Sequence, residues 1–403
     1  MKTEFLSQES DQASQIMAAV NRERLLDTAL RLLSKPSRTG DATGAADELE
    51  AVLSADGFNV ERPVAGHPAA PAVVVRFSSG RPGRTLQFNG HLDTVHLPFV
   101  PPQRVGGRLT GSGAADMKAG IAAAVEALRA IRETGGLSGG DILFTAHDLH
   151  EAPWGDGRQL DALIANGYFG DAVLIPEYLN EVLPIIGRGG FGWTAEIRRA
   201  SPAIHEVLRP DEPSVIATGA KVVACLEQLN TALSSKRHPL AGSESVFIGT
   251  IQSGSIYNEY PQVCRLEGTR RWLPGTRFAD AHRQLRELCS DLADSTGTTI
   301  DVETRLIRDA FQLDPDDPIV NVFQSAYKTT TGKVLPLGGK PFLDDGNSFW
   351  NGAGIPAITH GPTAGGAHTT SEWVDVDDLV RVARLYALIA TMYCPKTQAA
   401  AYY

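Results

Sequence analysis

The sequence predicts an α/β fold: a mostly parallel sheet covered by helices, with a smaller α+β domain inserted into it. The chain has 403 residues, 42% of them hydrophobic, and this length exceeds the size at which a single core usually divides. Strand-like and helix-like segments alternate up to Pro184, which is typical of a sheet with parallel strands. From there to Phe311 the pattern changes to several strands around two helices.

The elements of the first part follow from hydrophobic spacing and from the residues that end each segment. Apolar residues recur at helical intervals in 22–34 and 44–54, and Gly or Pro follows each stretch. The Ala-rich segment 116–136 has the same spacing and ends on Arg and Gly, as a helix C-terminus does. We expect one further helix at about 157–166, and strands at 71–77, 84–95, 140–148 and 170–178.

The middle of the chain has the pattern of a small α+β domain. Its two helices are expected at 213–234 and 278–294. Its strands are expected at 191–199, 245–254, 263–273 and 298–307. The first pattern then resumes at 318–332, and a last helix is expected at about 375–393. The sequence therefore predicts a large domain of residues 1–185 and 312–403 and an inserted domain of residues 186–311.

Composition excludes several classes of function. The net charge is −10 and no long run of Lys or Arg stands out, so nucleic acid is not an expected partner. No stretch reaches the ~20 apolar residues of a membrane helix, and the acidic N-terminus does not resemble a signal peptide. The scattered cysteines are expected to be reduced thiols. We expect a cytoplasmic protein that binds neither membranes nor nucleic acid. The cysteines are Cys225, Cys264, Cys289 and Cys394.

Histidines and carboxylates follow the strands of the large domain or lie in its Gly-rich loops. In open α/β sheets such positions converge at the carboxyl ends of the strands. His nitrogens and carboxylate oxygens suit Zn²⁺ or a similar divalent ion, and the set is large enough for two ions that share a bridging carboxylate. The candidates are His91, Asp93, Asp116, His150, Glu151, Glu177 and His368.

The same segments resemble a known family. The motifs "GHLDTV", "GSGAADMKAGIAA", a Glu after the next strand, "IPE" and a late "GP…AH…SEW" are similar to those of the dinuclear zinc hydrolases that include acetylornithine deacetylase, succinyl-diaminopimelate desuccinylase, aminoacylase and glutamate carboxypeptidase. The resemblance runs in order from about residue 20 to residue 393.

The resemblance implies a role for each candidate ligand. His91 and Glu177 would bind one metal, His368 would bind the other, and Asp116 would bridge both. Asp93 would orient the imidazole of His91, as carboxylates behind metal ligands do. Two divalent ions per subunit are expected, Zn²⁺ first and Mn²⁺ or Co²⁺ as alternatives.

One position departs from the family. Members of the family carry two adjacent glutamates after the third strand, a general base and then a ligand of the second metal. This chain has His150 and Glu151 there, so Glu151 keeps the ligand position and His150 occupies the base position. A histidine can accept a proton near neutral pH. Two alternatives remain: Glu151 is itself the base, or Asp148 serves after a shift of the loop.

The inserted domain carries further matches. His205 corresponds to a family histidine that reaches the neighbouring subunit's site and stabilises the oxyanion, which implies a homodimer through this domain. Asn258 and Arg271 correspond to residues that bind the substrate's carbonyl and carboxylate; Arg is suited to the latter because its fork can hold a carboxylate bidentately. Arg270 is the alternative, and Thr269 replaces the usual acidic residue of the motif. The "GRGG" of residues 187–190 would be the hinge between a catalytic domain and a lid.

These features predict a metal-dependent hydrolase that cleaves an amide-type C–N bond in a small carboxylate-bearing substrate, as an N-acyl amino acid deacylase or carboxypeptidase does. A water bridging the metals would attack the carbonyl, with His150 or Glu151 as the base. Two alternatives remain open. One is a deaminase-type aminohydrolase of an aromatic or heterocyclic acid, and the other is a non-catalytic homologue that binds metal or ligand.

Overall fold

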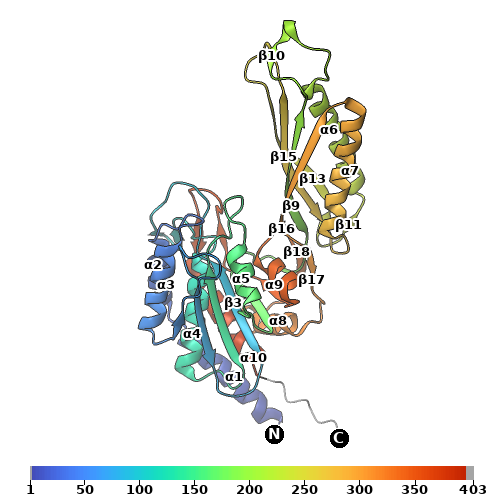
Figure 1. Ribbon diagram of the computed structural model, residues 1–403. Helices are drawn as coiled ribbons and strands as arrows, with labels where there is room; N and C mark the ends of the chain where they lie inside the picture. The colour runs from blue at the N-terminus through green and yellow to red at the C-terminus, as the bar shows by residue number, and fades with distance from the viewer. Residues whose placement is uncertain (1, 396–403) are drawn as a thin grey trace. The chain divides into compact units, whose positions relative to one another are not determined.

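The computed structural model describes residues 2–395, and the side chains from residue 11 onward. The chain forms two compact units (Figure 1). The first contains the described residues up to Ile185, Leu313–Leu337 and those from Ser348 onward. The second contains Ile186–Gln312 and Gly338–Asn347. The fold is the mixed α/β fold that the sequence predicts. The second unit also includes Gly338–Asn347, a segment expected from the sequence in the large domain.

The first unit is built on a six-stranded sheet whose central strands are parallel. The strand order is β1-β2-β6-β3-β7-β19. Parallel pairing joins β6 to β3, β3 to β7 and β7 to β19, whereas β1 and β2 are antiparallel to their neighbours. The strands are β1 (Val60–Glu61), β2 (Val73–Ser78), β3 (Thr85–His91), β6 (Asp141–His147), β7 (Ala172–Ile175) and β19 (Ala357–Thr359).

Helices cover this sheet, and their ends follow ordinary capping rules. Asn21 accepts a hydrogen bond from Arg24 N–H at the start of α2, and Gly135 ends α4 in the left-handed region at φ 60°. Helices α2, α4, α8 and α10 pack on one another. The helices of this unit are α1 (Lys2–Ala19), α2 (Arg22–Leu33), α3 (Thr43–Ala55), α4 (Lys118–Thr134), α5 (Arg158–Ala165), α8 (Pro318–Thr331) and α10 (Val376–Tyr393); α9 (Asp345–Ala353) begins in the second unit.

A second, small sheet brings together loops that are far apart in the sequence. Its order is β20-β21-β5-β4, with Trp373 of β21 paired to Thr110 of β5. The loop between β5 and α4 therefore lies beside the loop between β20 and β21. The strands are β4 (Gln103–Val105), β5 (Arg108–Thr110), β20 (Ala364–Gly365) and β21 (Trp373–Asp375).

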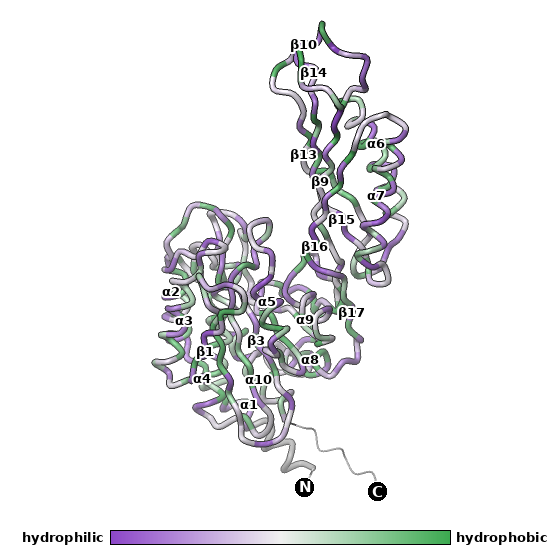
Figure 2. The backbone as a smooth tube through the Cα atoms, in the orientation of Figure 1, coloured by the Kyte–Doolittle hydropathy of each residue, from purple (hydrophilic) through white to green (hydrophobic). Residues whose placement is uncertain are grey.

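The second unit has one antiparallel sheet and two helices that bury one face of it. The order is β13-β15-β9-β16, and hydrophobic and hydrophilic residues alternate along these strands (Figure 2). The core includes Trp193, Leu226, Trp272 and Leu285. The elements are β9 (Gly189–Arg198), β13 (Ser245–Ser253), β15 (Val263–Trp272), β16 (Thr299–Arg308), α6 (Val215–Leu233) and α7 (Phe278–Thr296).

Short elements complete the second unit and the segments that lead into it. β10 (Ile204–His205) pairs with β14 (Glu259–Tyr260), and β11 (Arg237–His238) pairs with β12 (Gly242–Ser243). β8 (Leu183–Gly187), β17 (Phe311–Gln312) and β18 (Leu337–Lys340) form a three-stranded sheet. No helix among residues 2–395 is long and apolar enough to span a membrane.

Candidate metal centre

The candidate ligands gather at the carboxyl end of the parallel strands. His91 is the last residue of β3, His150 and Glu151 follow β6, and Glu177 follows β7. This is the edge at which loops of an α/β sheet form ligand sites. Asp116 precedes α4, and His368 lies between β20 and β21, so the small sheet brings these two residues to the same place.

Asp116 lies between two histidines. Its Oδ1 is 3.0 Å from Nε2 of His91, and its Oδ2 is 3.3 Å from Nε2 of His368. Burial opposes ionisation of this carboxyl, but the hydrogen bonds from His368 and His91 outweigh burial and hold its pKa well below the usual range. A carboxylate with one oxygen directed to each histidine has the arrangement required of a bridging ligand.

Glu151 completes the group around Asp116. Its Oε2 is 3.1 Å from His368 Nε2. His91, Asp116 and Glu151 each offer a ligand atom within 4.8 Å of the others, and all three are buried. The hydrogen bonds of His368 to Asp116 and Glu151 raise its pKa to about 10, because they favour the charged imidazolium. The carboxylates of Asp116 and Glu151 thus stabilise a positive charge at the position of His368.

His150 lies directly over His91. The ring centroids are 4.0 Å apart and the planes differ by 4°, and His150 Nε2 is 4.0 Å from Glu177 Oε1. Proximity alone makes His91, His150 and Glu177 a possible ligand group. Ring orientation opposes this, because an imidazole lone pair lies in the ring plane and two parallel rings do not both aim at an ion about 2.0–2.1 Å away. Their parallel stacking therefore argues against a shared ion between His91 and His150.

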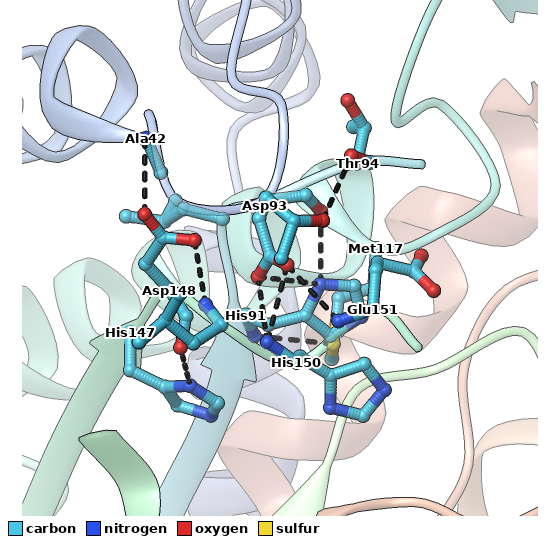
Figure 3. Close-up of polar contacts among 12 residues, drawn as sticks. Ala42, His91, Asp93, Thr94, Met117, His147, Asp148, His150 and Glu151 are labelled. Atoms are coloured by element: carbon cyan, nitrogen blue, oxygen red, sulfur yellow. Dashed lines mark hydrogen bonds and ion pairs between the residues drawn. The ribbon is translucent and has the colours of Figure 1, made fainter. Parts of the chain in front are cut away.

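Asp93 holds the loop that carries His150 and Glu151. Its carboxylate accepts the backbone N–H of His150 at 3.1 Å and of Glu151 at 3.0 Å (Figure 3). The Nδ1 of His91 is 3.0 Å from the backbone oxygen of Asp93 and 3.6 Å from its Oδ1. The backbone carbonyl of the buried Asp93 therefore holds the imidazole of His91. The carboxylate of Asp93 holds the loop after β6, which carries His150 and Glu151.

The side chain of Asp148 points away from His150, toward Ala42 (Figure 3). Its Oδ1 accepts the N–H of Gly40 at 2.9 Å, and its Oδ2 accepts the N–H of Ala42 at 3.1 Å. His67 Nε2 is also 3.1 Å from Oδ2. The carboxylate of Asp148 thus holds the start of the loop after β6 and does not face the metal cluster.

Two residues that sequence reasoning did not single out lie beside the cluster. Glu372 accepts the N–H of Ala115 at 3.1 Å and of Asp116 at 3.2 Å, and burial raises its pKa to about 7. Lys118 is fully buried, donates to the carbonyl of Lys35 at 2.8 Å, and burial lowers its pKa to about 7. Glu372 lies in the motif "SEW" and Lys118 in the motif "DMKAG", so their positions within these motifs were the sequence signal that could have identified them.

The second unit contains the remaining candidates. Nε2 of His205 lies 3.1 Å from Nδ2 of Asn258, and both side chains are on the surface of this unit. Arg270 is buried and paired with Glu244 at 2.6 Å, whereas Arg271 is only partly buried. Burial and the neighbouring Arg188 lower the pKa of Arg271.

The donor set fits two divalent ions. Nitrogen and carboxylate oxygen ligands suit Zn²⁺ and related ions, and Asp116 has the bridging arrangement described above. The cluster is buried apart from His368, and its carboxylates crowd together in a way that cations stabilise. An α/β unit with such a cluster at the carboxyl edge of its strands defines the class of dinuclear metallohydrolases.

Comparison with known proteins identifies the family. Residues 87–392 match Peptidase family M20/M25/M40, and the chain belongs to this family. It is 27% identical over 391 residues to succinyl-diaminopimelate desuccinylase of Methylobacterium sp. (strain 4-46), a match covering 92% of this chain and 96% of the relative. The protein is a metal-dependent hydrolase of C–N bonds.

Solved structures show the same fold. Aminopeptidase PepT of Bacillus cereus superposes with a TM-score of 0.77 at 22% identity, covering 93% of this chain and 99% of that one. The YXEP protein of Bacillus subtilis, described as a dinuclear metal-binding peptidase of the M20 family, gives a TM-score of 0.67 at 16% identity, with 92% and 97% covered. The family binds two metal ions.

Proposed function

We propose that the protein hydrolyses the amide bond of a small carboxylate-bearing compound, such as an N-acyl amino acid. The arrangement of Asp116 between His91 and His368 is the observation that supports this most strongly. His91, Asp116 and Glu177 would hold one ion, and Asp116, Glu151 and His368 the other. Two divalent ions there supply Lewis acidity toward a carbonyl oxygen and toward water. The donor atoms favour Zn²⁺, with Mn²⁺ or Co²⁺ as alternatives.

His150 is the proposed general base. Glu151 is directed to His368 and Asp148 is bound by backbone N–H groups, whereas the ring of His150 is stacked parallel to the ring of His91. It would take the proton of the attacking water and return it to the departing amine. Replacing His150 with Ala should lower kcat by about 10²–10⁴-fold while two ions per chain stay bound. Loss of one ion from this variant would instead identify His150 as a ligand.

The substrate carboxylate is proposed to bind at Arg271. Neither Arg271 nor its neighbour Arg188 has a carboxylate partner among the ion pairs of the described residues, whereas the buried Arg270 and Arg199 each have one. Two guanidiniums without a counter-ion attract an anion. Asn258 would bind the substrate's carbonyl, and His205 would stabilise the oxyanion in the site of a second subunit.

We also propose a homodimer formed through the second unit and a location in the cytoplasm. The edge strand β13 exposes Phe247 on one face of the sheet and Ile251 on the other, and the neighbouring helix α6 exposes Ile216. Exposed apolar side chains along a free sheet edge suit contact with a second copy. The four cysteines are free, as expected in a reducing compartment.

The decisive experiment compares substrates on protein loaded with Zn²⁺, Mn²⁺ or Co²⁺. N-succinyl, N-acetyl and N-formyl amino acids and dipeptides should be hydrolysed, and the corresponding methyl esters of the carboxylate should be poor substrates because they lack the charge that Arg271 binds. An amino-aromatic acid, tested beside them, distinguishes the deaminase-type alternative by release of ammonia. Absence of turnover of every amide, with two ions bound, would contradict the proposed substrate class.

A further inference from the structure

An exposed indole, that of Trp154, lies on the loop after β6, which also carries Glu151. Trp154 is 45% exposed and stacks on the imidazole of His96, with ring centroids 4.5 Å apart and planes 9° apart. His96 Nε2 is 3.1 Å from the carbonyl of Thr39, so this nitrogen donates and the imidazole is fixed from behind. The imidazole of His96 therefore covers one face of the indole. The solvent-exposed surface of Trp154 lies on the rest of the indole.

Both members of the stack are tethered to the metal cluster by short segments. Trp154 is three residues after Glu151, and His96 is three residues after Asp93. Three residues span at most about 11 Å. The tether of Trp154 is shorter still, because Gly155 N–H donates to the carbonyl of Glu151 at 2.6 Å. Asp93 binds the amide N–H of Glu151, which joins the two segments at their base.

Two exposed aromatic residues of the first unit lie on loops next to the cluster. Its described residues include three exposed aromatic side chains, Phe99, Trp154 and Phe169. Phe99 stands on the His96 loop, which is bound to the Asp116 loop by Ser112 N–H to the carbonyl of Val100 at 3.0 Å. Phe169 instead precedes β7, at the opposite end of that strand from Glu177.

We propose that Trp154, held by His96, is the platform for a planar aromatic or heteroaromatic ring of the substrate. An indole that is fixed on one face and open to solvent close to a reaction centre is suited to stack a flat group, and aromatic pairs gain affinity beyond the area they bury. This inference rests on the proposed function, because it identifies the part of the amide substrate that the rim of the site selects.

Two substrates that differ only in planarity test the proposal. N-acetylphenylalanine and N-acetylcyclohexylalanine share the amide, the carboxylate and the ring size, but only the first can stack. For the Zn²⁺-loaded protein, both kcat/KM and the Kd measured by calorimetry should favour the planar compound by between two- and about ten-fold. Trp154→Leu should abolish this preference, and Trp154→Phe should retain most of it.

Phe169→Leu provides the matched control, because it removes an aromatic residue of similar exposure at the other edge of the sheet, and it should leave the preference unchanged. Equal binding of the two compounds by the wild-type protein, or an unchanged preference in Trp154→Leu, would overturn the platform. Failure of the proposed function looks different: the planar compound would bind preferentially but neither compound would be hydrolysed.

Discussion

Asp93 illustrates how single buried carboxylates organise this site. It accepts two backbone N–H groups, one from His150 and one from Glu151, and therefore sets the position of the proposed base and of a proposed ligand together. The buried Asp148 does the same for the start of the loop through Gly40 and Ala42. Charged hydrogen bonds of this kind are stronger than neutral ones, so the loop after β6 can hold His150 and Glu151 in place without forming a regular element.

Replacing Asp93 with Asn should weaken metal binding. Both close bonds go to Oδ2, so the single amide oxygen can keep them, but without the charge that strengthens them. The NH₂ group would then stand at the position of Oδ1 and oppose the N–H of His150, 3.3 Å away. We expect a fall in metal affinity of about 10–100-fold, measured by competition with a chelator. Asp156→Asn, which changes an exposed acid of the same loop, is the control. Equal affinities of the two variants would contradict the role of Asp93.

His360 should make the protein sensitive to acid. It is fully buried beside Phe323 and Tyr327, and burial lowers its pKa to about 3, whereas an unfolded histidine titrates near about 6.5. Between these values the unfolded state binds more protons, so stability falls as the pH drops through this window, by up to about 1.4 kcal/mol per pH unit. Urea unfolding at pH 7 and pH 5 should show a smaller loss for His360→Leu than for the wild type. Equal losses would assign the acid sensitivity to other groups.

The sequence motifs name the residues that meet at the metal cluster, but they do not predict its geometry. The residues of the motifs do meet, because strand ends in a parallel sheet share one edge. The sequence could not decide among Asp148, His150 and Glu151, since that depends on the path of a loop whose Leu149 adopts φ 67°. It also could not separate Arg270 from Arg271, because the pairing of Arg270 with Glu244 joins residues of two different segments.

The elements differ in how readily hydrophobic spacing predicts them. Most of the longer strands and helices lie where the sequence predicts them, as for α2 (Arg22–Leu33) and α7 (Phe278–Thr296), whereas the buried strands β8 and β19 were not predicted. The short strands β4, β5, β20 and β21 were missed because two or three residues carry no periodicity. Helix α1 (Lys2–Ala19) was missed because polar residues interrupt its apolar positions. These omissions matter for function, since the small sheet places Asp116 beside His368.

The arm that carries His205 depends on one buried arginine. Arg199 is paired with Glu212 at 3.0 Å, donates to the carbonyl of Pro261 at 2.9 Å, and lies over the ring of Tyr260. Tyr260 O–H donates to the carbonyl of Glu212 at 2.6 Å. These contacts close the loop of residues 199–212 at its base, next to the strand that leads from Asn258.

Replacing Arg199 with Leu should free the arm. The variant removes the contacts that join the two ends of the arm and leaves the side chain of Glu212 without its cation. We expect faster limited proteolysis within residues 200–212 and a lower kcat, with metal content unchanged because the cluster belongs to the first unit. Arg198→Leu, at the neighbouring and more exposed position, is the control. Equal cleavage rates in both variants would contradict the proposed role of Arg199 in closing the loop of residues 199–212.

At the scale of the whole molecule, the second unit should join two copies of the chain. Its sheet ends at β13, an edge strand with exposed Phe247 and Ile251, and unpaired edges favour association. Phe247→Glu should convert the dimer to a monomer in sedimentation experiments. Leu306→Glu, on the opposite edge strand β16, should remain dimeric. A monomeric wild-type protein, or dissociation caused by the β16 variant alone, would place the interface elsewhere.

A crystal structure of the Zn²⁺-loaded protein, with anomalous scattering measured at the zinc edge, would show whether Asp116 bridges two ions. We expect two ions per chain, one bound by His91, Asp116 and Glu177 and the other by Asp116, Glu151 and His368. The imidazole of His150 should lie beside the first ion without binding it. A single ion that leaves Asp116 without a bridging role, or ions bound at other residues, would contradict this arrangement.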